Sequence, residues 1–182
     1  MYYRVVARDY ANQYTSNAAT ICPCNGSACT VCSCQDCIKG TQTVKRNSSV
    51  YNSGSYPNYC CNDCANYVSQ AMAAGSVPTS NTWKSGTSAW VGCGAMKTYF
   101  TSTNNWWTAS NYTNCNAGGI IMLTKAGSSS PYHVVMCVHN DTATRKFSGH
   151  TTDRKEQLYD LNYNWGTNTS ASYYVFSYCN PV

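Results

Sequence analysis

Cysteine is the residue that most restricts how this chain can fold. It occurs thirteen times among 182 residues, and six of the thirteen lie in ICPCNGSACTVCSCQDC at 21–37. So dense a set of thiols is typical of proteins that fold in an oxidising compartment. We therefore expect disulfide bonds and a secreted protein, either extracellular or associated with a cell wall. The odd number leaves one thiol over after full pairing, and a leftover thiol is a candidate reactive group.

The cysteine-rich segment has two interpretations. It holds few large apolar residues, so we expect local disulfides to staple it as an insertion at about 18–45. The alternative is a tetrahedral zinc site, because two C-x-x-C pairs with this spacing occur in zinc proteins. Its ligands would be Cys29, Cys32, Cys34 and Cys37. The cysteines elsewhere in the chain favour disulfides, and hence a protein without a cofactor.

Composition limits the partners that this chain can have. Apolar residues make up 43% of it, enough for the core of a single domain over 1–182, which we expect to be monomeric. The net charge of +5 favours approach to an anionic polymer. Lys45-Arg46 and Arg145-Lys146 are isolated pairs, so we expect no nucleic-acid partner.

Neither a membrane span nor a signal peptide is visible in the sequence. No run approaches the ~20 apolar residues that a span requires, so we expect none. The first eight residues, MYYRVVAR, lack the apolar core of a signal peptide. Either a leader has been removed or export uses another route.

The helical signal is strongest at 64–74, CANYVSQAMAA, where apolar residues recur at helical spacing. Asp63 is a cap-type residue before it, and Gly75 and Pro78 suit its end. Residues 2–17 predict a second helix, with Val5, Val6 and Tyr10 near one face, and 88–100 a third. Residues 41–59 are polar and predict irregular structure.

Four later segments read as strands: 119–123, 133–139, a strand starting at 146–149, and 171–178. Helices followed by strands joined through short connections predict a mainly antiparallel sheet and an α+β fold. The 64–74 helix, with a cysteine at its start, would pack on that sheet.

Cys64 is the candidate nucleophile because it opens the strongest helix. A cysteine attacks as thiolate, and the unpaired amides and positive dipole end of a helix N-terminus favour that anion. The same amides are suited to hold an oxyanion. The alternative is that Cys64 is one more half-cystine beside Cys60 and Cys61.

A nucleophilic cysteine requires a base, and the chain has three histidines. His133 begins a predicted strand, and His139 lies about 20 Å further along it at ~3.3 Å per residue. His150 ends the next strand. If the two strands pair as a hairpin, His133 and His150 become neighbours and His139 lies at the far end. This geometry selects His133 as the base and His150 as the residue that orients it.

Four segments resemble the putative amidase domain family, a branch of the papain-like cysteine hydrolases related to NlpC/P60 cell-wall enzymes. They are YYRVVARDYANQY, NDCANYVSQAMAAGSVP, YHVVMCV and FSGHTTDRKEQ. They follow the family's order, and the match runs over most of 60–176. Trp83 and Trp90 fall where the family tends to carry tryptophans. The resemblance implies a papain-like, NlpC/P60-like α+β fold.

The resemblance also implies Cys64 as nucleophile and His133 as general base. For the third position it leaves His150, our choice, and Asp153 as a rival, while Asp63 is a helix cap or an oxyanion contributor. One departure is Gly118-Gly119-Ile120, where the family often has a G-D-[IL] strand start. We expect the missing carboxylate to be structural.

The function implied is hydrolysis of an amide bond in peptidoglycan. An N-acetylmuramoyl-L-alanine amidase and a stem-peptide endopeptidase would share the same residues. Two other classes stay open: a non-catalytic, disulfide-rich module that binds cell wall, and a toxin or effector that acts on protein amides.

Overall fold

The computed structural model combines helices with a large antiparallel sheet. It describes residues 2–17, 36–39, 42–45, 48–59, 62–103, 108–110, 115–124, 128–141, 143–151, 153–158 and 172–177, with only the backbone given for β1, β2, β3 and β8. The elements in chain order are α1 (Arg4–Gln13), β1 (Asp36–Lys39), β2 (Gln42–Lys45), the 3-10 turn η1 (Ser48–Val50), α2 (Cys64–Ala74), α3 (Ser88–Val91), α4 (Cys93–Thr98), the π-helical turn η2 (Tyr99–Thr103), β3 (Thr108–Ser110), β4 (Ile120–Thr124), β5 (Pro131–Asn140), β6 (Arg145–Gly149), β7 (Arg154–Leu158) and β8 (Ser172–Ser177).

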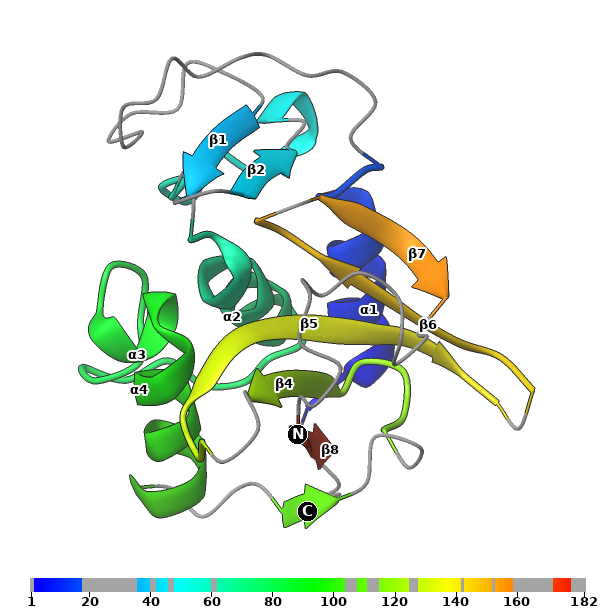
Figure 1. Ribbon diagram of the computed structural model, residues 1–182. Coiled ribbons are helices and arrows are strands. Elements are labelled where there is room, and N and C mark those ends of the chain that lie inside the picture. Colours follow the sequence, from blue (N-terminus) through cyan, green and yellow to red (C-terminus); the bar gives the residue numbers. More distant parts are fainter. Residues whose placement is uncertain are drawn as a thin grey trace.

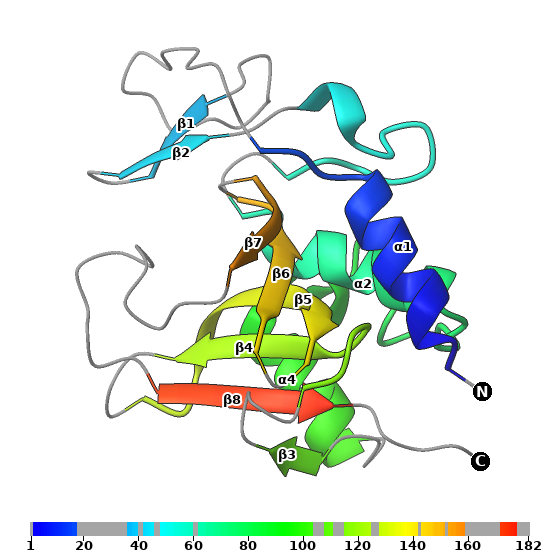
Figure 2. The same ribbon diagram turned by 90° about the vertical axis from the view of Figure 1, so that its right-hand side faces the viewer.

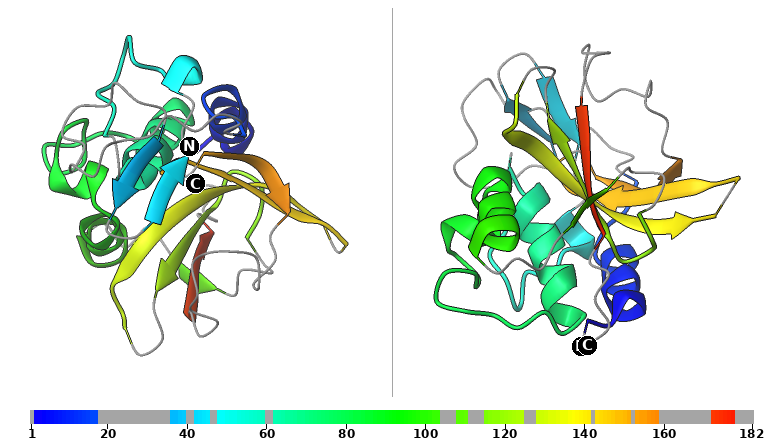
Figure 3. Two further views of the ribbon diagram at one scale, coloured as in Figure 1. Left: turned by 45° about the horizontal axis from the view of Figure 1, so that its top comes forward. Right: turned by 90° about the horizontal axis from the view of Figure 1, so that it is seen from below.

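The main sheet has the strand order β3-β8-β4-β5-β6-β7, and every neighbouring pair is antiparallel. β5 is its long, curved central strand, and β1 and β2 form a separate hairpin (Figure 1; Figure 2). The α+β class is therefore confirmed, and so is the predicted hairpin between the strands of His133 and His150. The helices α1, α2 and α4 lie on one face of the sheet (Figure 3).

The core lies between those helices and that face. β4 and β5 alternate: Ile120, Met122, Val134, Met136 and Val138 join the helix side, whereas Ile121, Leu123, Val135 and Cys137 join a smaller cluster on the other face. Strands covered on both faces read as continuous apolar runs rather than as alternating ones, which is the pattern of both strands here. α2 is the central helix, because residues 64–72 are all buried.

α1 packs on α2 through small side chains. Ala7 and Ala11 are fully buried, whereas Val5 and Val6 are exposed, so the predicted apolar face of this helix was wrong. The two helices approach so closely at Gly75 that an added Cβ would lie 2.5 Å from the Tyr2 ring. Glycine is thus required at the predicted end of α2 by contact with the N-terminal segment.

The other predicted helices and loops were confirmed only in part. The helix at 64–74 is confirmed, and the expected helix at 88–100 is two short ones separated at Gly92. Residues 41–59 were predicted to be irregular, yet β2 and η1 lie there, and the cysteine-rich loop contains β1. No described helix is long and apolar enough to cross a membrane.

Candidate active site

Cys64 lies at the first residue of α2, and its Sγ is 3.5 Å from the Sγ of Cys93. Cys93 is the first residue of α4. Both sulfurs are thiols and not disulfide-bonded, and their side chains are 6% and 9% exposed. At this separation one thiol donates a hydrogen bond to the other sulfur.

His133 reaches the same sulfur from the sheet. It lies at an irregularity where β5 carries an extra residue opposite β4, since Leu123 pairs with His133 but Thr124 pairs with Pro131. Neighbouring residues of a regular strand point to opposite faces. Here the rings of Tyr132 and His133 are stacked with centroids 6.5 Å apart. A bulge re-aims a side chain in this way.

The environment of Cys64 favours its anion. The pKa of this thiol lies well below its ordinary value, first because of the hydrogen bond with Cys93. Burial acts in the opposite direction, since a buried site disfavours charge. The charge of the His133 ring, its hydrogen bond and the backbone N–H of Val134 lower the pKa further. These are the conditions under which a cysteine becomes a nucleophile at neutral pH.

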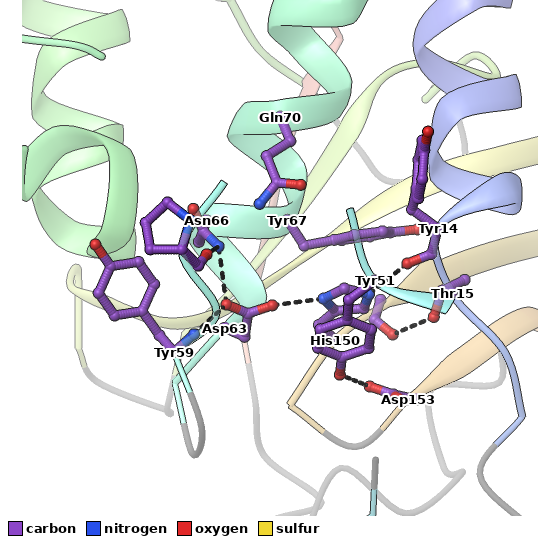
Figure 4. Close-up of polar contacts among 12 residues, drawn as sticks. Tyr14, Thr15, Tyr51, Tyr59, Asp63, Asn66, Tyr67, Gln70, His150 and Asp153 are labelled. Atoms are coloured by element: carbon purple, nitrogen blue, oxygen red, sulfur yellow. Dashed lines mark hydrogen bonds and ion pairs between the residues drawn. The ribbon is translucent and has the colours of Figure 1, made fainter. Parts of the chain in front are cut away.

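Asp63, directly before Cys64, is the centre of a buried polar network (Figure 4). Its Oδ1 accepts hydrogen bonds from the Tyr59 backbone N–H and from Asn66 Nδ2, both at 2.9 Å. Its Oδ2 lies 2.6 Å from His150 Nδ1. The carboxylate is 1% exposed and makes no side-chain cap bond to α2. Asp63 therefore joins the start of the helix to the sheet.

His150 is held on four sides. Its Nε2 lies 2.7 Å from the Tyr14 carbonyl oxygen, and its ring is stacked between Tyr51 and Tyr67 with centroids 3.9 and 4.0 Å away (Figure 4). A carbonyl only accepts, so Nε2 carries a hydrogen. Both ring nitrogens are thus engaged by residues other than His133, and the ring is 2% exposed.

Asp153 is linked to the same ring through Tyr51, whose ring is stacked on His150. It accepts a short hydrogen bond from the Tyr51 hydroxyl and is 1% exposed. The structure thus brings the sequence-predicted residues together in two groups: Cys64 with His133, and Asp63 with His150, to which Tyr51 connects Asp153.

His139 and the remaining described cysteines lie elsewhere. His139 is at the far end of β5, as expected, where it pairs with Asp141 on the surface. Cys115 and Cys137 are thiols packed on the opposite face of the sheet. The predicted disulfides are thus not found among the described cysteines, and those of the 18–45 insertion lie outside the described side chains.

The zinc alternative also falls outside the described residues. Cys29, Cys32 and Cys34 are not among them, and only the backbone of Cys37 is described. Within the described part of the chain, no three His, Cys, Asp or Glu side chains are grouped as metal ligands.

Comparison with known families places the chain in one of them. A family model described as "Putative amidase domain" matches residues 1–175. The chain belongs to this amidase family. The match includes the helix of Cys64, the strand of His133 and the turn of His150, and it supports a hydrolase of amide bonds. No solved structure matches the chain.

One curated relative of this amidase-family chain is the "Uncharacterized protein YjcM" of Bacillus subtilis (strain 168). It is 35% identical over 86 residues, which is 47% of this chain and 18% of the relative. The matched part of the chain therefore spans less than a fifth of that relative's length.

Three contacts of the candidate site could not be read from the sequence. Cys93 lies 29 residues after Cys64 and has no motif around it. Tyr51 lies in a segment predicted to be irregular. Trp90, expected only by resemblance, donates its indole N–H to Asn66 Oδ1 at 2.8 Å. The cysteine count had predicted disulfides and a single leftover thiol, so it gave no signal for a second free thiol beside Cys64.

Proposed function

We propose that this chain is a cysteine hydrolase that cuts an amide bond in peptidoglycan, with Cys64 as nucleophile and His133 as base. The observation that carries the proposal is the lowered pKa of the Cys64 thiol beside the His133 ring at the start of a buried helix. Membership of the amidase family supports the reaction class.

In the first step the Cys64 sulfur attacks the carbonyl carbon of the amide. A tetrahedral oxyanion forms, and the amides at the start of α2 are the donors suited to it, because the first N–H groups of a helix have no partner within the helix. His133, which has taken the proton of the Cys64 thiol, then donates it to the departing amine. The amine leaves, and the acyl group remains on Cys64 as a thioester.

In the second step water attacks the thioester, and His133 accepts the proton of that water. The carboxylic acid leaves, and the Cys64 thiolate and the protonated His133 are restored. Cys93 contributes by donating its hydrogen bond to the Cys64 thiolate, which holds the resting enzyme in its nucleophilic form.

Strand pairing suggested His150 as the third catalytic residue, the one that orients His133, but its contacts favour another role. Both nitrogens of His150 are engaged by Asp63 and the Tyr14 carbonyl. We therefore propose that His150 and Asp63 are positioning residues. They fix the peptide that precedes Cys64 rather than the ring of His133.

The substrate class rests on the resemblance and on charge. A net charge of +5 favours an anionic polymer such as cell wall. The ring of Tyr132, 39% exposed and stacked near His133, offers an aromatic surface beside the site for a sugar or a stem peptide. The proposal includes secretion and action as a monomer.

Digestion of purified peptidoglycan with mass spectrometry of the products tests bond and nucleophile together. An N-acetylmuramoyl-L-alanine amidase releases intact stem peptides with a free L-alanine amine, whereas an endopeptidase leaves shortened stems on the glycan. Cys64→Ala and His133→Ala are expected to abolish either product. His139→Ala is the matched control, because His139 lies on the same strand but is exposed at its far end.

A fully active Cys64→Ala enzyme would refute the proposal that Cys64 is the nucleophile. An inactive wild type on several wall types, together with rapid alkylation of Cys64, would remove the substrate and leave the reactive thiol standing. That second outcome would favour the toxin or effector alternative, with a protein amide as substrate.

A further inference from the structure

The contact between Cys64 and Cys93 joins the proposed nucleophile to a second thiol. Their sulfurs are 3.5 Å apart, and a disulfide bond is about 2.05 Å long, so an approach of roughly 1.5 Å separates the dithiol from a bond. Rotation about the Cα–Cβ bonds supplies a movement of that size. The hydrogen bond between the two sulfurs shows that they face one another.

The surrounding contacts hold the two thiols within reach. The Ser69 hydroxyl of α2 donates to the Trp90 carbonyl at 2.9 Å, and the Trp90 indole donates to Asn66 of α2 at 2.8 Å. Trp90 is buried and lies three residues before Cys93. The short segment that carries Cys93 is thus fastened to the helix that carries Cys64.

We propose that Cys64 and Cys93 form a redox modification site, which a peroxide converts into an intramolecular disulfide. The Cys64 thiolate attacks one oxygen of the peroxide, which gives a sulfenic acid on Cys64 and a released hydroxide. The Cys93 thiolate then attacks the sulfur of that sulfenic acid, the S–S bond forms, and a second hydroxide leaves. The two protons of the two thiols convert both hydroxides to water. Two electrons pass from the sulfurs to the peroxide.

The lowered pKa of the Cys64 thiol supports this order, because the thiolate is the form that reacts first. Cys93 then acts as the resolving thiol. A disulfide also protects the nucleophile, since sulfenic acid that is not captured proceeds to irreversible sulfinic acid. A dithiol reductant reverses the bond by exchange.

The consequence for catalysis rests on the proposed function: the disulfide removes the nucleophile, so the hydrolase is active only when reduced. The formation of the bond does not depend on that function. The described residues hold a second pair of neighbouring thiols on the other face of the sheet, where a hydrogen bond with Cys115 lowers the pKa of Cys137. That pair is more deeply buried, at 0% and 2% exposed, than Cys64 and Cys93 at 6% and 9%.

The test treats the full-length, reduced protein with hydrogen peroxide, blocks remaining thiols by alkylation, and digests without reductant. Cleavage before aspartate and after lysine places Cys64 alone in fragment 63–84 and Cys93 alone in fragment 85–97, apart from Cys60 and Cys61. We expect these two fragments to be joined, lighter than their sum by two hydrogens, and to separate after dithiothreitol.

Two variants sharpen the result. Cys93→Ser keeps a hydrogen-bond donor but cannot form the bond, so we expect Cys64 to accumulate as sulfinic acid that dithiothreitol does not reverse. Cys115→Ala removes a thiol on the other face and should leave the cross-link intact. Separate fragments in the oxidised wild type, or a cross-link of Cys64 to any other cysteine, would overturn the proposal. Wild type that is cross-linked but never hydrolyses peptidoglycan would leave the redox site standing and remove only the proposed function.

Discussion

Replacement of His150 by phenylalanine separates a positioning role from a catalytic one. Phenylalanine keeps a ring between Tyr51 and Tyr67 but removes both hydrogen bonds. The bond to the Asp63 carboxylate is worth about 1.5–3 kcal/mol and that to the Tyr14 carbonyl about 0.5–1.5 kcal/mol, so we expect a loss of about 2–4.5 kcal/mol. The free energy of unfolding of a native domain is about 5–15 kcal/mol, so we expect the variant to fold.

Urea unfolding in the presence of reductant, followed through tryptophan fluorescence, measures this loss, because Trp83 and Trp90 are buried. His139→Phe is the control and should change the free energy of unfolding by less than about 0.5 kcal/mol, as is usual at exposed positions. A loss below about 1 kcal/mol for His150→Phe would refute the positioning role.

A second substitution tests why His150→Phe lowers the free energy of unfolding. With His150 gone, Asp63 Oδ2 is a buried carboxylate oxygen without its partner, which is the expensive part of breaking such a pair. Asp63→Asn removes the charge. We therefore expect the double variant to lose about 1–3 kcal/mol less than the sum of the two single variants. Additive losses would show that the two residues do not act as a pair.

Three other substitutions test separate contacts. Cys93→Ala removes the first cause of the lowered pKa of the proposed nucleophile, so the rising acid limb of the rate–pH profile should move to higher pH, and by less in Cys93→Ser. Gly118→Ala should lose more than about 2 kcal/mol in urea unfolding, because φ is +82° and the new Cβ would lie 2.4 Å from the Arg4 carbonyl oxygen, whereas Gly54→Ala meets no atom. Trp90→Phe removes a buried indole hydrogen bond to the asparagine of α2 and should lose about 1–2 kcal/mol in the same assay.

Local signals in the sequence were sufficient for the elements that carry the site. The helix at 64–74 is defined by apolar spacing with Asp63 before it and Gly75 after it, all within a few residues. The hairpin that carries His133 and His150 follows from two adjacent strand patterns, and its register places His139 by the turn as expected.

The side-chain contacts were beyond the sequence because they join distant segments. Asp63 and His150 are 87 residues apart, and Cys64 and Cys93 are 29 apart. Strand pairing made His150 a neighbour of His133, but a neighbour along the backbone is not a hydrogen-bond partner. The His150 ring instead contacts the Asp63 carboxylate, directly before α2, and the Tyr14 carbonyl, directly after α1. The bulge at His133 likewise breaks the alternation on which a sequence argument depends.

Two hydrogen-bonded attachments, one through Asp63 and one through Asn66, hold the start of α2 around Cys64. Asp63, the residue before Cys64, is tied to His150 after β6, and Asn66, in the same first turn of α2 as Cys64, is tied to Trp90. Between these two attachments the backbone of Cys64 has little freedom, so the sulfur moves only by rotation of its own side chain. The orientation of a nucleophile within a few tenths of an ångström is what proximity in catalysis requires. The buried network is therefore more than support for the fold: loosening either attachment is expected to slow alkylation of Cys64 and to lower the yield of its disulfide with Cys93 together, since both depend on where one sulfur lies.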